Sequence, residues 1–185
     1  MTYNKEILRC FQCSDLIRLG RMKDGGYVIP KRLTRKSVAM ISCGISTDWS
    51  FEKDFISLSK ISNYFLVDKS TSIRSLFKRL LECFKNKNVS INFKIFLLIH
   101  FIYKSPRVFL MRRRQKNKFI ESFIVPSKKT YHKDKSTITL EKLLSSLKTN
   151  KKKNNIFLKL DIEGSEWDIY PEILKNLDSF SGIAI

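Results

Sequence analysis

The stretch Ile156–Tyr170 reads IFLKLDIEGSEWDIY and predicts the fold of the chain. It opens with a short apolar run, which is typical of a strand buried in a parallel sheet. The run ends abruptly at Asp161, Glu163 follows, and Gly164 allows the sharp turn that directs both acids. Because ligands of open α/β sheets bind beyond the carboxyl ends of the strands, Asp161 and Glu163 are candidates for chemistry there.

The acids further along this stretch have a simpler explanation. Glu166 and Asp168 fall where a helix begins, and the positive end of a helix dipole favours negative side chains. Pro171 would cost a hydrogen bond inside a helix started by Ser165. We therefore expect one turn over 165–169 and a new helix with Pro171 at its first position.

An earlier stretch has the same pattern of strand and turn. Residues 37–43 read SVAMISC and predict a buried strand, followed by the turn Gly44–Ser50. A helix comes next, with Phe51, Phe55 and Leu58 on one face. Only one glycine is present, so the glycine-rich signature of a nucleotide-binding turn is incomplete, and Ser46 within the turn is a small residue that replaces part of it.

The next apolar run, Asn63–Asp68, predicts a second strand that ends in an acid. Asp68 follows Gly44 by 24 residues, near the ~20-residue spacing of a ribose-binding carboxylate. We favour that role over an ordinary surface acid at a strand end. Residues 119–125 predict a third strand.

The N-terminal part contains a turn signal, Asp24–Gly26, before the short strand Tyr27–Ile29. One interpretation is a plain hairpin, and the other is a backbone brought close to a ligand, which paired glycines also allow.

Composition predicts a single domain over residues 1–185, with residues 1–36 as an N-terminal extension and 85–135 as a basic and apolar insertion. The net charge is +19, and residues 71–155 carry 22 basic and 4 acidic groups. Such a field favours phosphate-bearing or membrane-surface partners, although a lysine-rich compositional bias explains it equally well. Four scattered cysteines favour a reducing cytoplasm, and Cys10 and Cys13 lack the second pair that a metal site needs.

The insertion contains the apolar run Phe93–Tyr103, which is shorter than the ~20 residues that span a bilayer. Three interpretations are open: a buried helix, which we favour, a helix lying in a membrane interface, or a partner-binding surface. Basic residues around the run suit anionic lipid, so residues 93–114 are the candidate for peripheral membrane contact. Nucleic acid is the weaker interpretation, because no stacking aromatics alternate with the basic runs. The apolar stripe of the preceding helix, Ile73–Phe84, is expected to pack on the sheet.

Three stretches carry a resemblance to a known family: Arg21–Val28 (RMKDGGYV), Ile41–Glu52 (ISCGISTDWSFE) and Leu158–Trp167 (LKLDIEGSEW). Together they are similar to the FkbM-type family of S-adenosylmethionine-dependent methyltransferases, and the third stretch is the strongest match. Residues 85–135 match poorly.

The resemblance implies a Rossmann-like class I methyltransferase sheet with flanking helices, and methylation of a hydroxyl on a saccharide or glycan precursor. By matching position, Gly44 would lie under the methionine part of S-adenosylmethionine and Asp68 would hold its ribose hydroxyls. Ser46 and Asp48 complete the expected cofactor-binding set.

The same resemblance places Asp161 and Glu163 at the border of the transfer site. A carboxylate there could accept the proton of the acceptor hydroxyl. We expect no metal ligand among these residues, and a cytoplasmic location that includes the inner face of the membrane.

Two departures from the family pattern define an alternative. The turn lacks the further glycines, and the chain stops at the strand near Gly182, so we expect a sheet truncated at the C-terminus. The alternative is a non-catalytic, methyltransferase-like protein that binds an anionic membrane or nucleic-acid surface.

Overall fold

The computed structural model describes residues 12–22, 25–46, 48–70, 73–127, 137–147, 149 and 153–185. A five-stranded sheet with the strand order β5-β4-β3-β8-β9 forms its centre, and every neighbouring pair in it is parallel. The strands are β3 (Ala39–Cys43), β4 (Asn63–Val67), β5 (Phe119–Ile120), β8 (Ile156–Leu160) and β9 (Phe180–Ala184).

This strand order confirms the predicted parallel α/β sheet and is consistent with a Rossmann-like fold. The chain runs outward from β3 to β4 and β5 on one side, then crosses back to β8 and β9 on the other. The direction of winding reverses between β3 and β8. In open α/β sheets, ligands bind at this reversal, outside the carboxyl ends of the strands.

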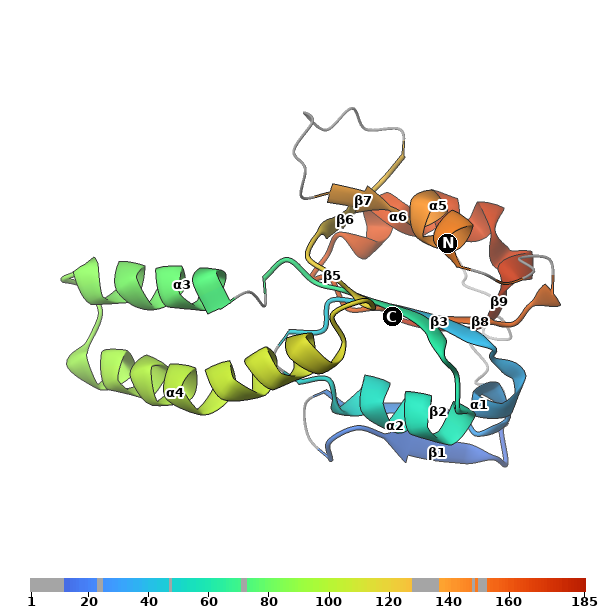
Figure 1. The fold of residues 1–185 in the computed structure, drawn as a ribbon, viewed down its shortest axis with the longest axis horizontal. Coiled ribbons are helices and arrows are strands. Elements are labelled where there is room, and N and C mark those ends of the chain that lie inside the picture. The colour runs from blue at the N-terminus through green and yellow to red at the C-terminus, as the bar shows by residue number, and fades with distance from the viewer. Residues whose placement is uncertain are drawn as a thin grey trace, which may run out of the picture.

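Helices and a small hairpin cover the two faces of the sheet (Figure 1). On one face lie α5 (Leu140–Ser146) and α6 (Glu166–Lys175), packed on alternate residues of β3 and β8. On the other lie α2 (Ser50–Ser59) and the antiparallel pair β1 (Leu16–Leu19) and β2 (Tyr27–Pro30). The short helix α1 (Arg32–Lys36) joins β2 to β3, and a short 3-10 helix over Leu177–Ser179 precedes β9.

The alternation of side chains along a strand explains how β8 contributes to the core on both faces of the sheet. All five residues of β8 are buried, but alternate side chains point to opposite faces. Ile156, Leu158 and Leu160 join the core under α5 and α6, whereas Phe157 packs against Phe55 of α2, with ring centroids 4.4 Å apart.

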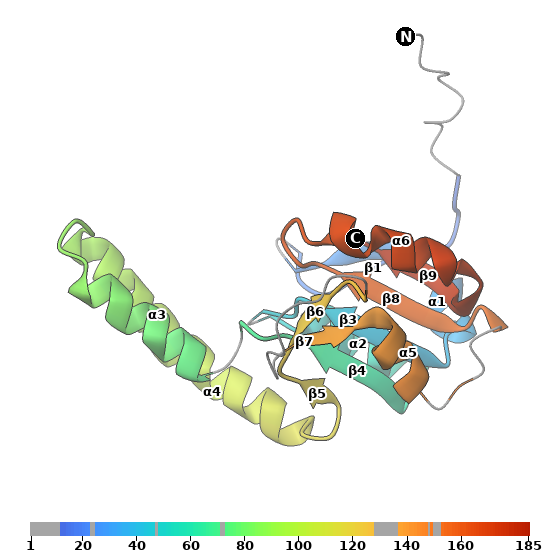
Figure 2. The same cartoon turned by 90° about the horizontal axis from the view of Figure 1, so that it is seen from above.

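A long helical hairpin projects from the sheet (Figures 1 and 2). It consists of α3 (Ile73–Lys85) and α4 (Ile91–Arg114), inserted between β4 and β5. Many of its large apolar side chains are exposed, by 38% to 66% of their surface, and we call this set the apolar hairpin surface. Its members are Phe77, Leu81, Phe84, Ile91, Phe93, Ile95, Phe96, Leu98, Ile99, Ile102, Tyr103, Phe109 and Leu110.

The hairpin corrects two predictions. The stripe of α3 does not pack on the sheet, because α3 packs on α4 instead, and the run Phe93–Tyr103 is not a buried helix. An apolar run favours burial only if another element covers it, and in the described chain only one side of α4 is covered. No helix among the described residues is long and apolar enough to cross a membrane.

Local predictions near the sheet are mostly confirmed, with three corrections. Helix α6 is continuous through Pro171, because Ile169 and Ile173, both buried, hold it on the core before and after the proline. Leu58 is half exposed. The predicted third strand is split, since β5 joins the main sheet and β6 (Phe123–Val125) instead pairs with β7 (Thr137–Thr139).

Candidate functional site

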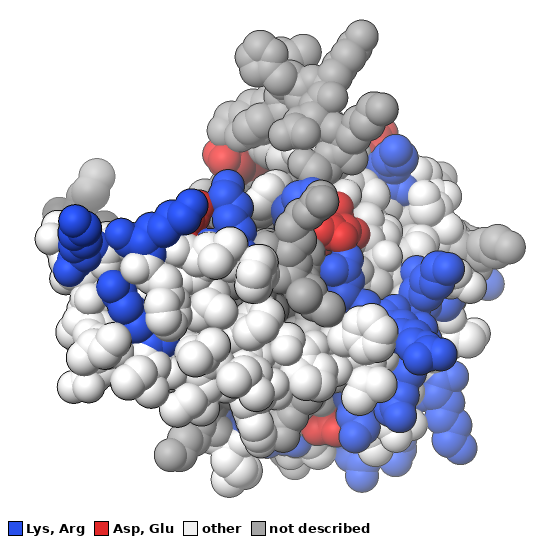
Figure 3. Space-filling view, turned by 60° about the vertical axis from the view of Figure 1, so that its left-hand side comes forward, with Lys and Arg blue, Asp and Glu red and all other residues white. Residues whose placement is uncertain are grey.

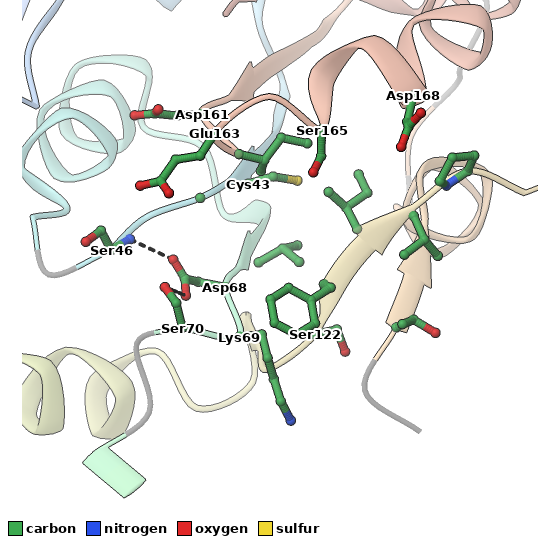
Figure 4. Close-up of a pocket in the computed structure, with 18 residues that line it drawn as sticks. Cys43, Ser46, Asp68, Lys69, Ser70, Ser122, Asp161, Glu163, Ser165 and Asp168 are labelled. Atoms are coloured by element: carbon green, nitrogen blue, oxygen red, sulfur yellow. Dashed lines mark hydrogen bonds between the residues drawn. The ribbon is translucent and has the colours of Figure 1, made fainter. Parts of the chain in front are cut away.

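A pocket of about 840 Å³ opens at the carboxyl ends of β3, β4 and β8, where the sheet reverses its winding (Figure 4). Its walls come from the β3 turn, the end of β4, the β6–β7 pair and the loop before α6. The lining residues are Cys43, Gly44, Ser46, Val67, Asp68, Lys69, Ser70, Ser122, Phe123, Ile124, Val125, Pro126, Thr137, Asp161, Ile162, Glu163, Ser165 and Asp168. The volume lies within the usual ~300–1,000 Å³ range of small-molecule sites.

Gly44 brings the turns after β3 and β8 into contact. It has a positive φ of 77°, and a Cβ at this position would lie 1.7 Å from the Asp161 carbonyl oxygen. The Asp161 N–H donates to the Cys43 carbonyl alongside. Packing against the protein's own backbone therefore requires glycine here, whether or not a ligand also approaches it.

Asp68 lies inside the pocket and is almost fully buried. Its Oδ2 accepts a 2.7 Å hydrogen bond from the Ser46 N–H, which a left-handed Ser46 (φ 52°) directs toward it. Its Oδ1 accepts a 2.8 Å hydrogen bond from the Ser70 hydroxyl. The two hydrogen bonds hold the carboxylate in position, and carboxylate oxygens are acceptors that suit the hydroxyl groups of a ligand.

Asp48 is placed outside the pocket, unlike the other predicted cofactor residues. Its Oδ2 pairs with the Arg21 guanidinium at 3.0 Å, and its Oδ1 accepts a 3.1 Å hydrogen bond from the N–H of Ser50, the first residue of α2. The carboxylate thus accepts a hydrogen bond from an N–H at the start of α2, and through Arg21 it links this helix to the segment between β1 and β2.

The loop between β8 and α6 is fastened by Glu166. Its carboxylate accepts 2.7 Å hydrogen bonds from the N–H groups of Ile162 and Gly164. Burial by itself would raise the pKa of Glu166, but these backbone donors hold that pKa below its ordinary value. The loop they fix carries Glu163 in a left-handed conformation, with φ 52°.

The two predicted catalytic acids point in different directions. In Figure 4 the Glu163 carboxylate extends into the pocket toward Ser46, whereas the Asp161 carboxylate points away from Asp68. Asp161 Oδ2 accepts a 2.7 Å hydrogen bond from the Tyr27 hydroxyl. Within the described chain, no group donates a hydrogen bond to the Glu163 carboxylate.

A buried ion pair lies beneath Asp161. Lys159 is 3% exposed and its ammonium lies 3.1 Å from Glu52 Oε1, and Glu52 is fully buried. The Ser42 hydroxyl donates to the same oxygen at 2.7 Å. Lys159 also lies 3.8 Å from Asp161 Oδ2 and over the Tyr27 ring, so it connects the buried core to the rim of the pocket.

Cys43 is the pocket's one thiol among the described residues, and it is inert. Burial raises the pKa of Cys43 to about 12, despite the opposing charge of Lys159. The thiolate is the nucleophilic form of cysteine, so at neutral pH this side chain is a small apolar part of the wall.

Among the described residues, four carboxylates line the pocket beside one lysine, Lys69; they are those of Asp68, Asp161, Glu163 and Asp168. Lys69 extends away from the labelled carboxylates (Figure 4). The site therefore favours a cationic or hydroxyl-rich ligand over an anionic one.

Sequence reasoning missed part of this arrangement. Asp168 lies in the first turn of α6, as predicted for a helix-start acid, but it also lines the pocket, and the β6–β7 wall has no counterpart in the predictions. The buried ion pair of Lys159 and Glu52 was also not predicted. Its signal in the sequence is a lysine inside an apolar strand, because a lysine is almost never fully buried without a partner. At the paired glycines, a Cβ on Gly26 would lie 2.1 Å from the Arg21 carbonyl oxygen, so the protein's own backbone requires glycine at this position.

Comparison of the chain with family models, curated proteins and solved structures finds no match.

Proposed function

We propose that the protein is an S-adenosylmethionine-dependent O-methyltransferase that acts on a hydroxyl of a saccharide or glycan precursor. The observation that carries the proposal is the meeting of Asp68, from the end of β4, with Glu163, from the loop after β8, in one pocket at the winding reversal. The first suits a ribose diol and the second suits an acceptor hydroxyl. The resemblance of the sequence to FkbM-type methyltransferases points the same way.

The charges of the site support a cofactor without phosphate. Nucleotide phosphates commonly bind at a helix N-terminus behind a glycine-rich turn. Here the Asp48 carboxylate already accepts the first N–H of α2, and acids dominate the pocket lining. A pyrophosphate would be repelled, whereas the positive sulfur of S-adenosylmethionine would be attracted.

When bound, S-adenosylmethionine supplies an electrophilic methyl group. Glu163, which extends into the pocket, would accept the proton of the acceptor hydroxyl as a general base. Asp161, oriented by the Tyr27 hydroxyl and by Lys159, would add negative charge at the rim. Asp68 would accept hydrogen bonds from the ribose hydroxyls.

A saccharide acceptor is favoured by an exposed aromatic pair on α6, the helix that follows the pocket loop. Trp167, 79% exposed, lies next to Tyr170 on α6, with ring centroids 6.2 Å apart. Exposed aromatic rings offer an apolar face with a polar edge, which matches the face of a sugar ring. Both follow within two turns of the loop that carries Glu163.

Calorimetric titration with S-adenosylmethionine tests the cofactor assignment. We expect saturable binding, weakened about tenfold or more by Asp68→Asn, because hydrogen bonds to a charged acceptor contribute ~1.5–3 kcal/mol. Asp48→Asn is the matched control, with the same chemical change outside the pocket, and should stay within about threefold. The proposal fails if the unmodified protein does not bind, or if both variants lose affinity equally.

Transfer of a labelled methyl group to a panel of saccharides tests the catalytic assignment. Glu163→Gln should lower turnover by ~10²-fold or more and leave S-adenosylmethionine affinity unchanged. Asp178→Asn, on the exposed segment before β9, is the control and should keep full turnover. Equal turnover of all three proteins would remove Glu163 from the mechanism.

A second candidate function is favoured by the α3–α4 hairpin. We infer from its exposed apolar and basic surface that the protein could instead serve as a non-catalytic, methyltransferase-like module at an anionic surface, peripheral to the inner face of the membrane. Binding to such a surface together with no methyl transfer to any acceptor would favour this candidate over the first.

A further inference from the structure

The α3–α4 hairpin exposes apolar side chains around most of its second helix. Phe93, Ile95, Phe96, Leu98 and Ile99 are all exposed. With about 3.6 residues per turn, five such positions within seven residues cannot share one narrow face. A helix that is apolar around its circumference is normally buried, so this part of the molecule has the surface of a helix that something else covers.

Contacts among the residues that the structure describes cover only a part of that surface. Phe77 of α3 meets Phe101 of α4 at 6.1 Å between ring centroids, and Val108 and Met111 are buried where α4 approaches the sheet. Apart from Phe77, the members of the apolar hairpin surface take no part in these contacts. Its extent exceeds what scattered surface apolar residues on a soluble domain would produce.

The hairpin is also strongly basic. Residues 73–114 contain eleven Lys and Arg residues and one acid, Glu82. Arg112 is engaged with Glu121 and stacks over the Phe119 ring, but Arg113 and Arg114 are exposed at the end of α4. Figure 3, which turns the hairpin toward the viewer, shows a broad uncharged surface with Lys and Arg side chains along its edges and few acids.

These two properties together select one kind of partner. A second copy would bring a hairpin with the same positive excess against the first, and like charges oppose that contact. A nucleic acid would use the basic residues but leave Ile and Leu side chains without a role. A bilayer containing anionic lipids takes up both, with headgroups for the cations and acyl chains for the apolar side chains.

We propose that the α3–α4 hairpin docks into the interface of an anionic bilayer, lying in its plane. It does not cross the bilayer, because Lys94, Lys104 and Arg107 interrupt the apolar sequence of α4, and no described helix qualifies as a span. Aromatic side chains on the surface suit the headgroup level, where amphipathic rings collect. The inference is independent of the proposed methyl transfer. Since α3 begins just after Asp68, docking would hold the pocket near the membrane.

Vesicle cosedimentation of the full chain tests the proposal. We expect binding to vesicles of phosphatidylcholine with about 30% phosphatidylglycerol, at least tenfold weaker binding to pure phosphatidylcholine, and a marked decrease at high salt. Phe96→Ser with Ile99→Ser, and separately Arg113→Glu with Arg114→Glu, should each lower the partition coefficient at least tenfold.

Two matched controls separate hairpin docking from general stickiness and charge. Leu58→Ser removes an exposed apolar side chain of α2, and Arg35→Glu with Lys36→Glu makes the same charge change on α1. Both should bind within about threefold of the unmodified protein. Circular dichroism verifies that each variant is folded.

Several results would overturn the proposal: no vesicle binding, equal binding to neutral vesicles, equal loss in controls and hairpin variants, or a hairpin-dependent dimer in sedimentation velocity. The last would identify a second copy as the occupant. Because calorimetry with S-adenosylmethionine needs no vesicles, failure of the docking proposal and failure of the proposed activity would be recognised separately.

Discussion

The sheet and the hairpin use the same kinds of residue in opposite ways. Phe55 of α2 is fully buried against the sheet, whereas Phe96 of α4 is 59% exposed. Lys159 on the sheet is buried and paired, whereas Arg113 on the hairpin is exposed. The difference teaches that the role of a phenylalanine or a cation here depends on which element lies opposite, and hardly on its local sequence.

The electrostatic contrast follows the same division. Carboxylates gather at the pocket, and Lys and Arg gather on the hairpin. One end of the molecule is therefore suited to a cationic or hydroxyl-rich ligand and the other to an anionic surface. Variants that compare equivalent residues in the two regions can test this division.

The largest expected effect compares two phenylalanines. Phe55→Ala should destabilise the protein by about 3–5 kcal/mol, because it empties a core position between Phe51 and Phe157. Denaturant unfolding measures the loss. The counterpart on the hairpin is Phe96→Ala, at an exposed position. Equal losses of unfolding free energy for the two variants would contradict the distinction between the regions.

The buried ion pair should give the next effect. Lys159→Met leaves the Glu52 carboxylate buried without its cation, which should cost about 3 kcal/mol. Adding Glu52→Gln should restore most of the loss, since the double variant buries no charge. The free energies of urea unfolding of the unmodified protein, the two single variants and the double variant form a double-mutant cycle. Additive losses would show that the pair does not act as a unit.

A smaller, pH-dependent effect is expected at Glu166. The folded protein lowers its pKa below the ordinary 4.5, so its contribution is complete above that pH and is lost as the pH falls through the folded value. Glu166→Gln should therefore cost up to about 1 kcal/mol at pH 7, because the carboxylate is only partly buried and solvent screens its interactions. The difference in unfolding free energy should narrow in acid, and a constant difference would contradict the assignment.

The smallest effect is expected on the hairpin. Phe96→Ala should change the free energy of unfolding by less than about 0.5 kcal/mol, as for surface substitutions in general. The measurement is made without lipid, beside that of Phe55→Ala. A loss of several kcal/mol would show that another part of the chain covers Phe96.

Much of the sheet could be predicted from the sequence. The apolar runs at β3, β4 and β8, the turn at Gly44 and the acid Asp68 all lie close to their predicted positions. These features depend on residues near one another in the chain. Gly44, Ser46, Asp68, Asp161 and Glu163 also meet in one pocket, as expected for the ends of parallel strands in a doubly wound sheet.

Other features could not be predicted, because they depend on distant contacts. Asp48 belongs to the expected turn, yet Arg21 draws its carboxylate away from the pocket. Pro171 predicts a helix boundary locally, but core packing on both sides carries α6 through it. The run Phe93–Tyr103 looks equally apolar whether it is covered or exposed, and only the position of the hairpin shows that it projects from the sheet.

The sequence by itself determined the alternation of strands and helices, the acids at the strand ends and the uneven distribution of charge, because each follows from residue type and short-range spacing. Only the tertiary structure decided that Glu163 faces the pocket while Asp161 is held by Tyr27, that Glu52 and Lys159 pair beneath it, and that α4 is left largely uncovered. Burial and pairing arise between segments far apart in the chain, so no local pattern specifies them.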